Sequence, residues 1–383
     1  MRLSLLIPML FFGGIILVPQ ISSDTVFPKS DWKERTAESQ GVDSKKLKSA
    51  LDYLESESGF DGIREAVIIR NGYMIWKGDN IDNEHSVASI SKAFTSTCFG
   101  LLIDDGKCGL NDLAKDYESR LDCEYPEYAE ITLRHFANMT SGYNGKGEGY
   151  RDDPDDGSET PFIPAAPAFP PGTKYSYCDD AMCMFGLVLT KIANDSLYNI
   201  FRQRIADPIG MNPEKWHWVD WGEIDGFTVN RSEGGIHITA RELARFGHLV
   251  LNRGNWEGSQ LVSGNWIDEA TKVQVPRTME GKADSPRQRR ISSLAVGSYG
   301  YHWWANGTMA DGSRLLPDAT PGTFYRSGWP MQRLFIIPEW NMVIVRIGRD
   351  KNKTDRPADP RACWNTVLKM VGEAIITKEK SER

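Results

Sequence analysis

Apolar residues recur every three or four positions in several segments of the chain, and this spacing predicts amphipathic helices. The clearest case has Leu47, Leu51 and Leu54 on one face, behind a capping residue at Asp43 or Ser44. The same reasoning predicts helices over about residues 89–104, 131–137, 181–194, 239–254 and 360–376.

Continuous apolar runs rich in β-branched residues predict strands near both ends of the chain. Residues 66–69 and 73–76 flank the pair Asn71-Gly72, which tolerates the positive φ angles of a two-residue hairpin turn. Residues 333–337 and 342–347 form a second pair of runs, joined by a short turn.

This order of elements predicts one antiparallel sheet built from both ends of the chain, flanked by helices, with an all-helical region inserted between. The fold class is therefore α/β (α+β). We assign residues 24–97 and 291–377 to the sheet region and residues 98–290 to the helical region with its loops. Within the helical region, residues 144–171 are rich in Gly, Pro and Asp, which predicts a long loop.

The composition favours a globular protein that does not bind nucleic acid. The chain has 383 residues, of which 40% are hydrophobic and 25% charged, so it can bury a sizeable core in one large or two interlocked domains. Its formal net charge is −7, whereas proteins that bind nucleic acid are usually basic.

The first 23 residues have the features of a secretory signal peptide. Arg2 supplies a positive charge, residues 3–18 are uncharged and mostly apolar, and small residues follow at Ser22 and Ser23. An uncleaved N-terminal anchor is the alternative, because the apolar run is long for a signal. No later stretch approaches the roughly 18 apolar residues that span a bilayer. We therefore expect an exported protein, periplasmic or secreted, without a membrane span after signal removal.

The cysteines and histidines show no metal-binding spacing. The six cysteines include no CxxC pair, and the chain has no HExxH, so we expect no metal ion. Disulfides stay an open question, since an exported protein can keep them but a chain of this size does not need them. Structural roles are expected for the scattered His135, His237, His248 and His302, and no organic cofactor is implied.

Ser89-Ile90-Ser91-Lys92 is a Ser-x-x-Lys segment at the start of a predicted helix. Positions i and i+3 share one helix face, so the ammonium can reach the hydroxyl. A serine needs an adjacent base to become a nucleophile, and a lysine serves as base only when it is partly deprotonated. The motif alone is weak evidence, because a capping serine beside a solvated lysine produces the same pattern.

Further segments occur in an order that resembles the class C β-lactamase and penicillin-recognising esterase family, over about residues 40–375. Residues 85–94 resemble the nucleophile segment of that family, and residues 171–177 resemble the segment with its catalytic tyrosine. Other matching pieces are 131–136 with Thr140-Ser141-Gly142, Gly234-Gly235 with Thr239 and 243–246, and 299–304 with Gly328-Trp329 and Gln332. The last pieces favour the esterases and 6-aminohexanoate-dimer hydrolases of the family over its lactamases.

The resemblance implies the β-lactamase/transpeptidase-like fold and an acyl-enzyme mechanism. It makes Ser89 the acylated nucleophile, Lys92 its proton partner and Tyr177 the second proton carrier. The backbone N–H groups of Ser89 and Trp329 would form the oxyanion hole. Arg326-Ser327-Gly328 stands where the lactamases have Lys-Thr-Gly.

Two positions depart from the family pattern. The Tyr-x-Asn of the family is Tyr177-Cys178-Asp179 here. An ionised Asp179 beside Lys92 would keep the lysine protonated and move the base role toward Tyr177, whereas Asp179 as a helix cap is the other interpretation. Arg326 either holds a substrate carboxylate or points to solvent. We assign Asp179, Arg326, Ser327 and Gly328 to substrate binding.

We therefore predict a serine hydrolase that cleaves an ester, amide or peptide-like substrate by two-step acyl transfer. A β-lactamase or a D-alanyl-D-alanine carboxypeptidase on the same fold is one alternative. A catalytically inactive binding protein of this fold is the other. The substrate, the oligomeric state and the identity of the base stay open at this stage.

Overall fold

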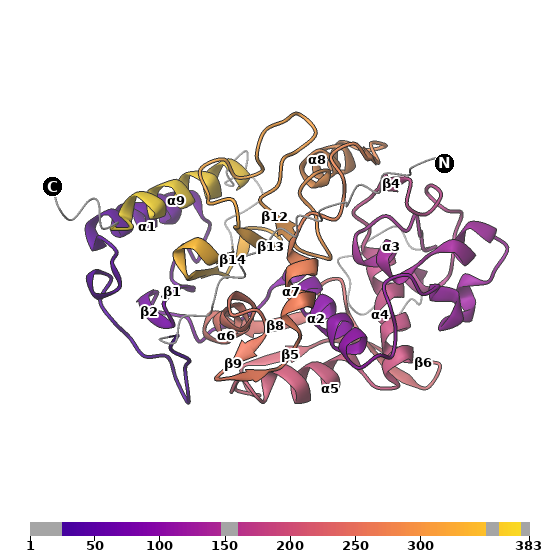
Figure 1. Cartoon of the computed structure of the whole chain (residues 1–383), viewed down its shortest axis with the longest axis horizontal. Coiled ribbons are helices and arrows are strands. Elements are labelled where there is room, and N and C mark those ends of the chain that lie inside the picture. The colour runs from indigo at the N-terminus through magenta and orange to yellow at the C-terminus, as the bar shows by residue number, and fades with distance from the viewer. Residues whose placement is uncertain (1–24, 147–159, 350–359, 377–383) are drawn as a thin grey trace, which may run out of the picture.

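The computed structural model describes residues 25–146, 160–349 and 360–376. The predicted signal peptide, residues 1–23, lies outside the described residues, so it stays a prediction. Within the described ranges, no helix is both long and apolar enough to cross a membrane. A sheet with its covering helices forms one end of the molecule, and a group of helices and short strands forms the other (Figure 1).

Both ends of the chain supply strands to one antiparallel six-stranded sheet, as the apolar runs predict. The hairpin of β1 (Ala66–Arg70) and β2 (Tyr73–Lys77) joins the C-terminal strands through pairing of β1 with β15 (Met342–Arg346). Asn71 and Gly72 have φ angles of 52° and 80°, as the two-residue turn requires. The order β12-β13-β14-β15-β1-β2 also includes β12 (Trp304–Ala305), β13 (Phe324–Gly328) and β14 (Gln332–Ile337).

Helices cover both faces of this sheet. α1 (Ser44–Glu57) packs along α9 (Pro360–Ala374), and the ring of Trp364 in α9 lies 5.2 Å from that of Phe335 in β14. Leu334, the neighbour of Phe335, points to the opposite face. There it meets α6 (Ala240–Leu251), where a Cβ on Gly247 would lie only 2.8 Å from its Cδ1. α6 therefore packs against the six-stranded sheet, although it comes from the segment that we assigned to the helical region.

The helix caps follow the sequence signals with one exception. Asp43, rather than Ser44, caps α1, since its side chain accepts from the backbone N–H groups of Lys45 and Lys46. Thr239 caps α6 through the N–H of Glu242. Thr239 and Glu242 have the spacing of a capping box, but only half of it forms, because the Glu242 carboxylate accepts from the N–H of Asn212 instead.

The inserted region is largely helical, but the prediction that it is all-helical is wrong. It contains a sheet of β5 (Trp216–Trp218) and β8 (Ile236–Thr239), which also takes in β3 (Glu84–Ser86). Strands this short offer too few alternating positions to be recognised from sequence. Further short strands are β4 (Lys174–Tyr175), β6 (Asp220–Ile224), β7 (Phe227–Asn230), β9 (Asn255–Trp256), β10 (Ser259–Gln260) and β11 (Glu280–Gly281). The helices are α2 (Ser91–Asp104), α3 (Leu133–Ala137), α4 (Asp179–Ala193), α5 (Leu197–Phe201), α7 (Gly264–Thr271) and α8 (Pro286–Ala295).

α2 is the central helix of the inserted region, and residues 91–102 are all buried. It packs against α4, α5 and α7. Its polar side chains are satisfied by distant backbone: Thr95 donates to the carbonyl of Ser232 at 3.2 Å, and Ser96 to that of Tyr301 at 2.8 Å. Because α2 is buried along most of its length, the residues at its N-terminus are held in a fixed position. All six cysteines of the chain are free thiols.

Candidate active site

Ser89 lies in a single 3₁₀ turn, η2 (Ala88–Ile90), that leads directly into α2. The α-helix starts two residues later than the sequence predicts, at Ser91. Ser89 and Lys92 nevertheless share one face, and the Lys92 ammonium donates to the Ser89 hydroxyl at 3.0 Å. Ala88 has a φ of 45°, in the left-handed region that non-glycine residues rarely adopt and that is enriched at functional sites.

Lys92 is fully buried with three oxygen partners. Besides the hydroxyl of Ser89, its Nζ donates to the carbonyl of Glu233 at 2.6 Å and lies 2.8 Å from the carboxylate of Asp179. Burial alone lowers the pKa of a lysine, but the negative charges of Asp179 and Tyr177 outweigh it and raise the pKa above its ordinary value. The ammonium therefore stays protonated at neutral pH.

Tyr177 completes a compact group around Ser89. Its hydroxyl is close enough to the Ser89 side chain to interact with it electrostatically, and the Lys92 Nζ lies 5.0 Å from the centre of its ring. Burial raises the pKa of Tyr177, but the positive charges of Lys92 and Arg326 bring it below its ordinary value. Gln288, on α8, donates to the Tyr177 carbonyl at 2.9 Å and fixes the backbone there.

Asp179 is the first residue of α4, but it does not cap that helix. The N-cap is Cys178, whose Sγ accepts from the N–H of Ala181 at 3.5 Å. The Asp179 side chain forms the ion pair with Lys92 instead, which is the first of the two interpretations of this position.

Arg326 does not point to solvent, because it is fully buried. Its assignment to substrate binding stays a prediction. Its guanidinium donates to the Ser89 carbonyl at 2.6 Å, to the Tyr299 hydroxyl at 3.2 Å and to the Tyr177 hydroxyl at 3.4 Å. Its nearest polar groups are thus the nucleophile turn and two phenols. The prediction that Arg326 points to solvent is wrong for this reason.

The end of β13 approaches the nucleophile turn closely. A Cβ on Gly328 would lie 2.1 Å from the carbonyl oxygen of Val87, so only glycine allows this contact. Gln332 strengthens it by donating to the carbonyl of Ser86. Ser327 is half-buried beside this contact, and Trp329 follows it with a side chain that is 66% exposed. The backbone of Trp329 therefore follows directly on the closest approach of β13 to the nucleophile segment.

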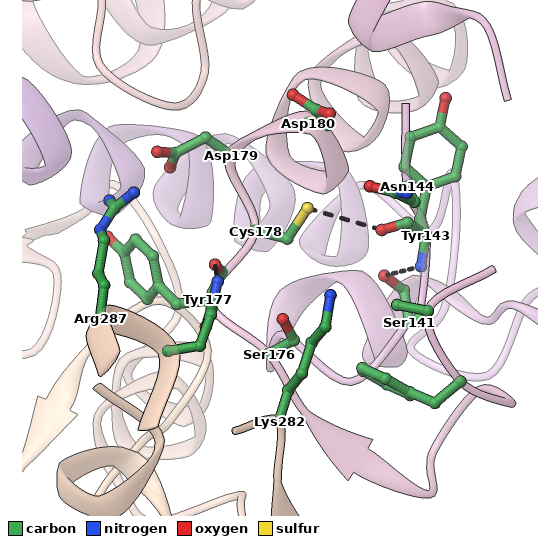
Figure 2. Close-up of a pocket in the computed structure, with 14 residues that line it drawn as sticks. Ser141, Tyr143, Asn144, Ser176, Tyr177, Cys178, Asp179, Asp180, Lys282 and Arg287 are labelled. Atoms are coloured by element: carbon green, nitrogen blue, oxygen red, sulfur yellow. Dashed lines mark hydrogen bonds between the residues drawn. The ribbon is translucent and has the colours of Figure 1, made fainter. Parts of the chain in front are cut away.

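A pocket of about 160 Å³ opens beside Tyr177 and Asp179. Its wall comes from residues 141–144 on one side and from Lys282 and Arg287 near α8 on the other (Figure 2). The lining of the pocket contains both basic and acidic side chains, since Asp180 lies there together with Lys282 and Arg287. Burial and the nearby Asp179 raise the pKa of Asp180 to about 6. Neither group of potential metal ligands among the described residues includes a residue of this pocket or of the Ser89 cluster.

Three groups contribute to the site in ways that the sequence does not predict. Tyr299 belongs to a segment quoted for the family resemblance, but no sequence signal pairs its hydroxyl with Arg326. Burial raises the pKa of Tyr299 to about 12, so its phenol stays neutral. The partner of Lys92 at Glu233 is a backbone carbonyl, which any residue type supplies. Gln288 acts from the distant helix α8.

Comparison with known proteins identifies the family. The model of the Beta-lactamase family matches residues 80–367, which is most of the chain, so the protein belongs to the Beta-lactamase family.

Individual relatives are distant. The chain is 21% identical over 286 residues to the 6-aminohexanoate-dimer hydrolase of Paenarthrobacter ureafaciens, covering 70% of this chain and 66% of that protein, just under two thirds. A penicillin-binding protein homologue from Caulobacter crescentus has a TM-score of 0.61 at 16% identity, and the match covers 87% of this chain and 99% of the homologue. A family VIII carboxylesterase has a TM-score of 0.62 at 15% identity, and the match covers 86% of this chain and 97% of the carboxylesterase. At these identities the solved structures show the fold, which is the β-lactamase/transpeptidase-like fold that the sequence predicts.

Proposed function

We propose that the protein cleaves ester or amide bonds through an acyl-enzyme on Ser89. The observation that carries this proposal is the contact of one hydroxyl with two proton-carrying groups. Lys92 Nζ lies 3.0 Å from the Ser89 Oγ, and the Tyr177 hydroxyl interacts with the same serine side chain. A serine hydroxyl that only caps a helix has no need of a buried ammonium and a phenol.

The charges favour Tyr177 as the base. Lys92 is held protonated by Asp179, so it has no lone pair to accept the serine proton. Tyr177, with its lowered pKa, takes the proton from Ser89 while Oγ attacks the carbonyl carbon. The same phenol then donates this proton to the leaving oxygen or nitrogen. Water repeats the sequence in the second step: it gives a proton to Tyr177, attacks the acyl carbon and restores the Ser89 hydroxyl.

The negative charge of each tetrahedral intermediate needs hydrogen-bond donors. We assign this role to the backbone N–H groups of Ser89 and Trp329, since Gly328 brings the end of β13 against the nucleophile segment. Arg326 contributes a fixed positive charge beneath the site and polarises the Ser89 peptide through its carbonyl.

The substrate that we propose is a small ester or linear amide. One relative is a 6-aminohexanoate-dimer hydrolase, and a carboxylesterase shares the fold. The pocket beside Tyr177 offers both acidic and basic side chains, which suits a polar substrate with charged ends. We further propose that the protein is exported, as the composition of residues 1–23 indicates.

A panel of substrates tests the proposal. Purified protein is expected to hydrolyse p-nitrophenyl acetate or the amide 6-aminohexanoate dimer, and Ser89→Ala is expected to abolish this turnover. Rapid turnover of nitrocefin without ester or linear amide hydrolysis would instead support the β-lactamase alternative. Full activity of Ser89→Ala on any of these substrates would overturn the role of the serine.

A further inference from the structure

The three-stranded sheet of β3, β5 and β8 brings two histidines and a glutamate together at the surface. β8 is the central strand, and its His237 lies directly opposite His217 of β5 and Ser86 of β3. Alternate residues of a strand point to the same face, so Glu84 shares the face of Ser86. The side chains of Glu84, His217 and His237 therefore gather on one side of the sheet.

The three side chains converge closely enough to share one ion. The rings of His217 and His237 stack with centres 4.6 Å apart and planes 20° from parallel, and His217 Nδ1 lies 2.9 Å from the Glu84 carboxylate. One ligand atom of each residue lies within 4.8 Å of the other two. A tetrahedral zinc ion with bonds of about 2.0–2.1 Å separates its ligand atoms by about 3.3 Å. Small side-chain rotations close that difference.

The chemistry of the ligands selects the type of metal. A neutral imidazole is the form that binds metal. Two imidazoles and one carboxylate suit zinc and similar transition metals, whereas calcium and magnesium prefer oxygen ligands only.

A second group, Asp61, Glu65 and His85, is less suited to an ion. The carboxylate of Asp61 already accepts from the backbone N–H of Arg349 at 2.7 Å and from its Nε at 3.1 Å. It also forms an ion pair with Arg64 at 3.4 Å. A cation there would have to displace or face two guanidinium groups.

We propose that Glu84, His217 and His237 form a zinc site, with the fourth coordination position open to water. The sequence shows no zinc-binding spacing because each ligand comes from a different strand. The site would tie together two segments of the catalytic region. β3 ends at Ser86, shortly before Ser89, and β8 follows Glu233, whose carbonyl accepts from Lys92. Zinc binding is therefore expected to stabilise the fold around the nucleophile without being needed for the reaction.

Calorimetric titration of the chelator-treated full chain with Zn²⁺ tests this proposal. We expect one equivalent to bind, no comparable binding of Ca²⁺, and a rise in Tm of about 3 °C at a hundredfold excess over Kd. His217→Gln and His237→Gln are each expected to weaken binding at least about a hundredfold, because even the outer partners of metal ligands change affinity by about 10–100-fold. The Tm rise should disappear in both variants.

His85→Gln is the matched control, because His85 is adjacent to Glu84 on β3 but belongs to the second group. This variant should bind zinc as the unchanged protein does. The proposal fails if zinc does not bind, if both His217→Gln and His237→Gln bind it normally, or if only His85→Gln loses it. Ser89→Ala should also bind zinc normally, so the site is tested independently of the proposed hydrolase activity. His217 is exposed, so its variant is expected to fold even if His237→Gln does not.

Discussion

The carboxylate of Asp179 lies 2.8 Å from the ammonium of Lys92, and this ion pair sits directly against the nucleophile. In the proposed mechanism it determines which residue accepts the serine proton. A lysine that is buried without an anion loses its proton readily, whereas this one is held charged. The paired Lys92 then acts as a fixed positive charge that lowers the pKa of Tyr177.

Asp179→Asn removes a carboxylate whose negative charge raises the pKa of Tyr177. Removal of this negative charge makes the first proton of the Lys92–Tyr177 pair easier to lose, whichever of the two residues carries it. The acidic limb of the plot of kcat/KM against pH is therefore expected to move to lower pH by at least about half a unit. Asp180→Asn is the control, since it removes a neighbouring carboxylate on the same helix and should leave the limb in place. An acidic limb that does not move in Asp179→Asn would contradict the assigned electrostatics.

Tyr177→Phe removes the proposed base and keeps the ring. Activity is expected to fall at least about a hundredfold, the low end for general acid–base catalysis. Tyr175→Phe is a matched control, because that tyrosine is buried two residues away and its hydroxyl makes no hydrogen bond within the described structure. Steady-state rates with p-nitrophenyl acetate compare the two. An active Tyr177→Phe enzyme would remove the phenol from the mechanism.

Arg326→Gln removes a positive charge that lowers the pKa of Tyr177. The acidic limb of kcat/KM should therefore move to higher pH, opposite to the shift in Asp179→Asn. We expect kcat/KM at neutral pH to fall at least about tenfold, equivalent to one pKa unit of the base. Arg326→Lys keeps the charge and should restore part of the loss. If the lysine and glutamine variants have identical pH profiles, the guanidinium acts through packing and not through its charge.

Asp180→Asn is expected to stabilise the protein in a pH-dependent manner. Burial raises the pKa of Asp180 from 3.8 to about 6, so ionisation costs more in the folded than in the unfolded chain. That cost is absent below the unfolded pKa, grows between the two values and is complete above the folded one. The asparagine avoids it and keeps an acceptor for the backbone N–H of Gly145.

We expect Asp180→Asn to raise the free energy of unfolding by about 1–3 kcal/mol at about pH 8 and by little at about pH 4, since each pKa unit corresponds to about 1.4 kcal/mol. Urea unfolding at the two pH values measures the difference. An equal effect at both values would show that the charge of Asp180 is not responsible.

The sequence predicts those parts of the fold that depend on local patterns. The helix after Asp43, the hairpin at Asn71-Gly72 and the C-terminal strands all carry periodicity or turn chemistry over enough residues to be recognised. β5 and β8 have three and four residues, so their pairing follows from tertiary packing and not from a readable alternation.

The candidate site divides in the same way. Ser89 and Lys92 are neighbours on one helix turn, so spacing alone brings them together. Tyr177 was assigned by family resemblance, because nothing local in the sequence relates it to a serine so far away in the chain. The inward direction of Arg326 could not be predicted, since it depends on Tyr299 and on a backbone carbonyl at Ser89.

Covalent labelling of Ser89 tests the central claim most directly. The protein is treated with a fluorophosphonate probe, and the labelled peptide is sequenced by mass spectrometry. We predict one label per chain on Ser89, no label in Ser89→Ala, and normal labelling in Ser91→Ala, whose serine only bonds to the backbone of Ala88 and Ile236. An unlabelled native protein, or a label that persists in Ser89→Ala, would contradict the account.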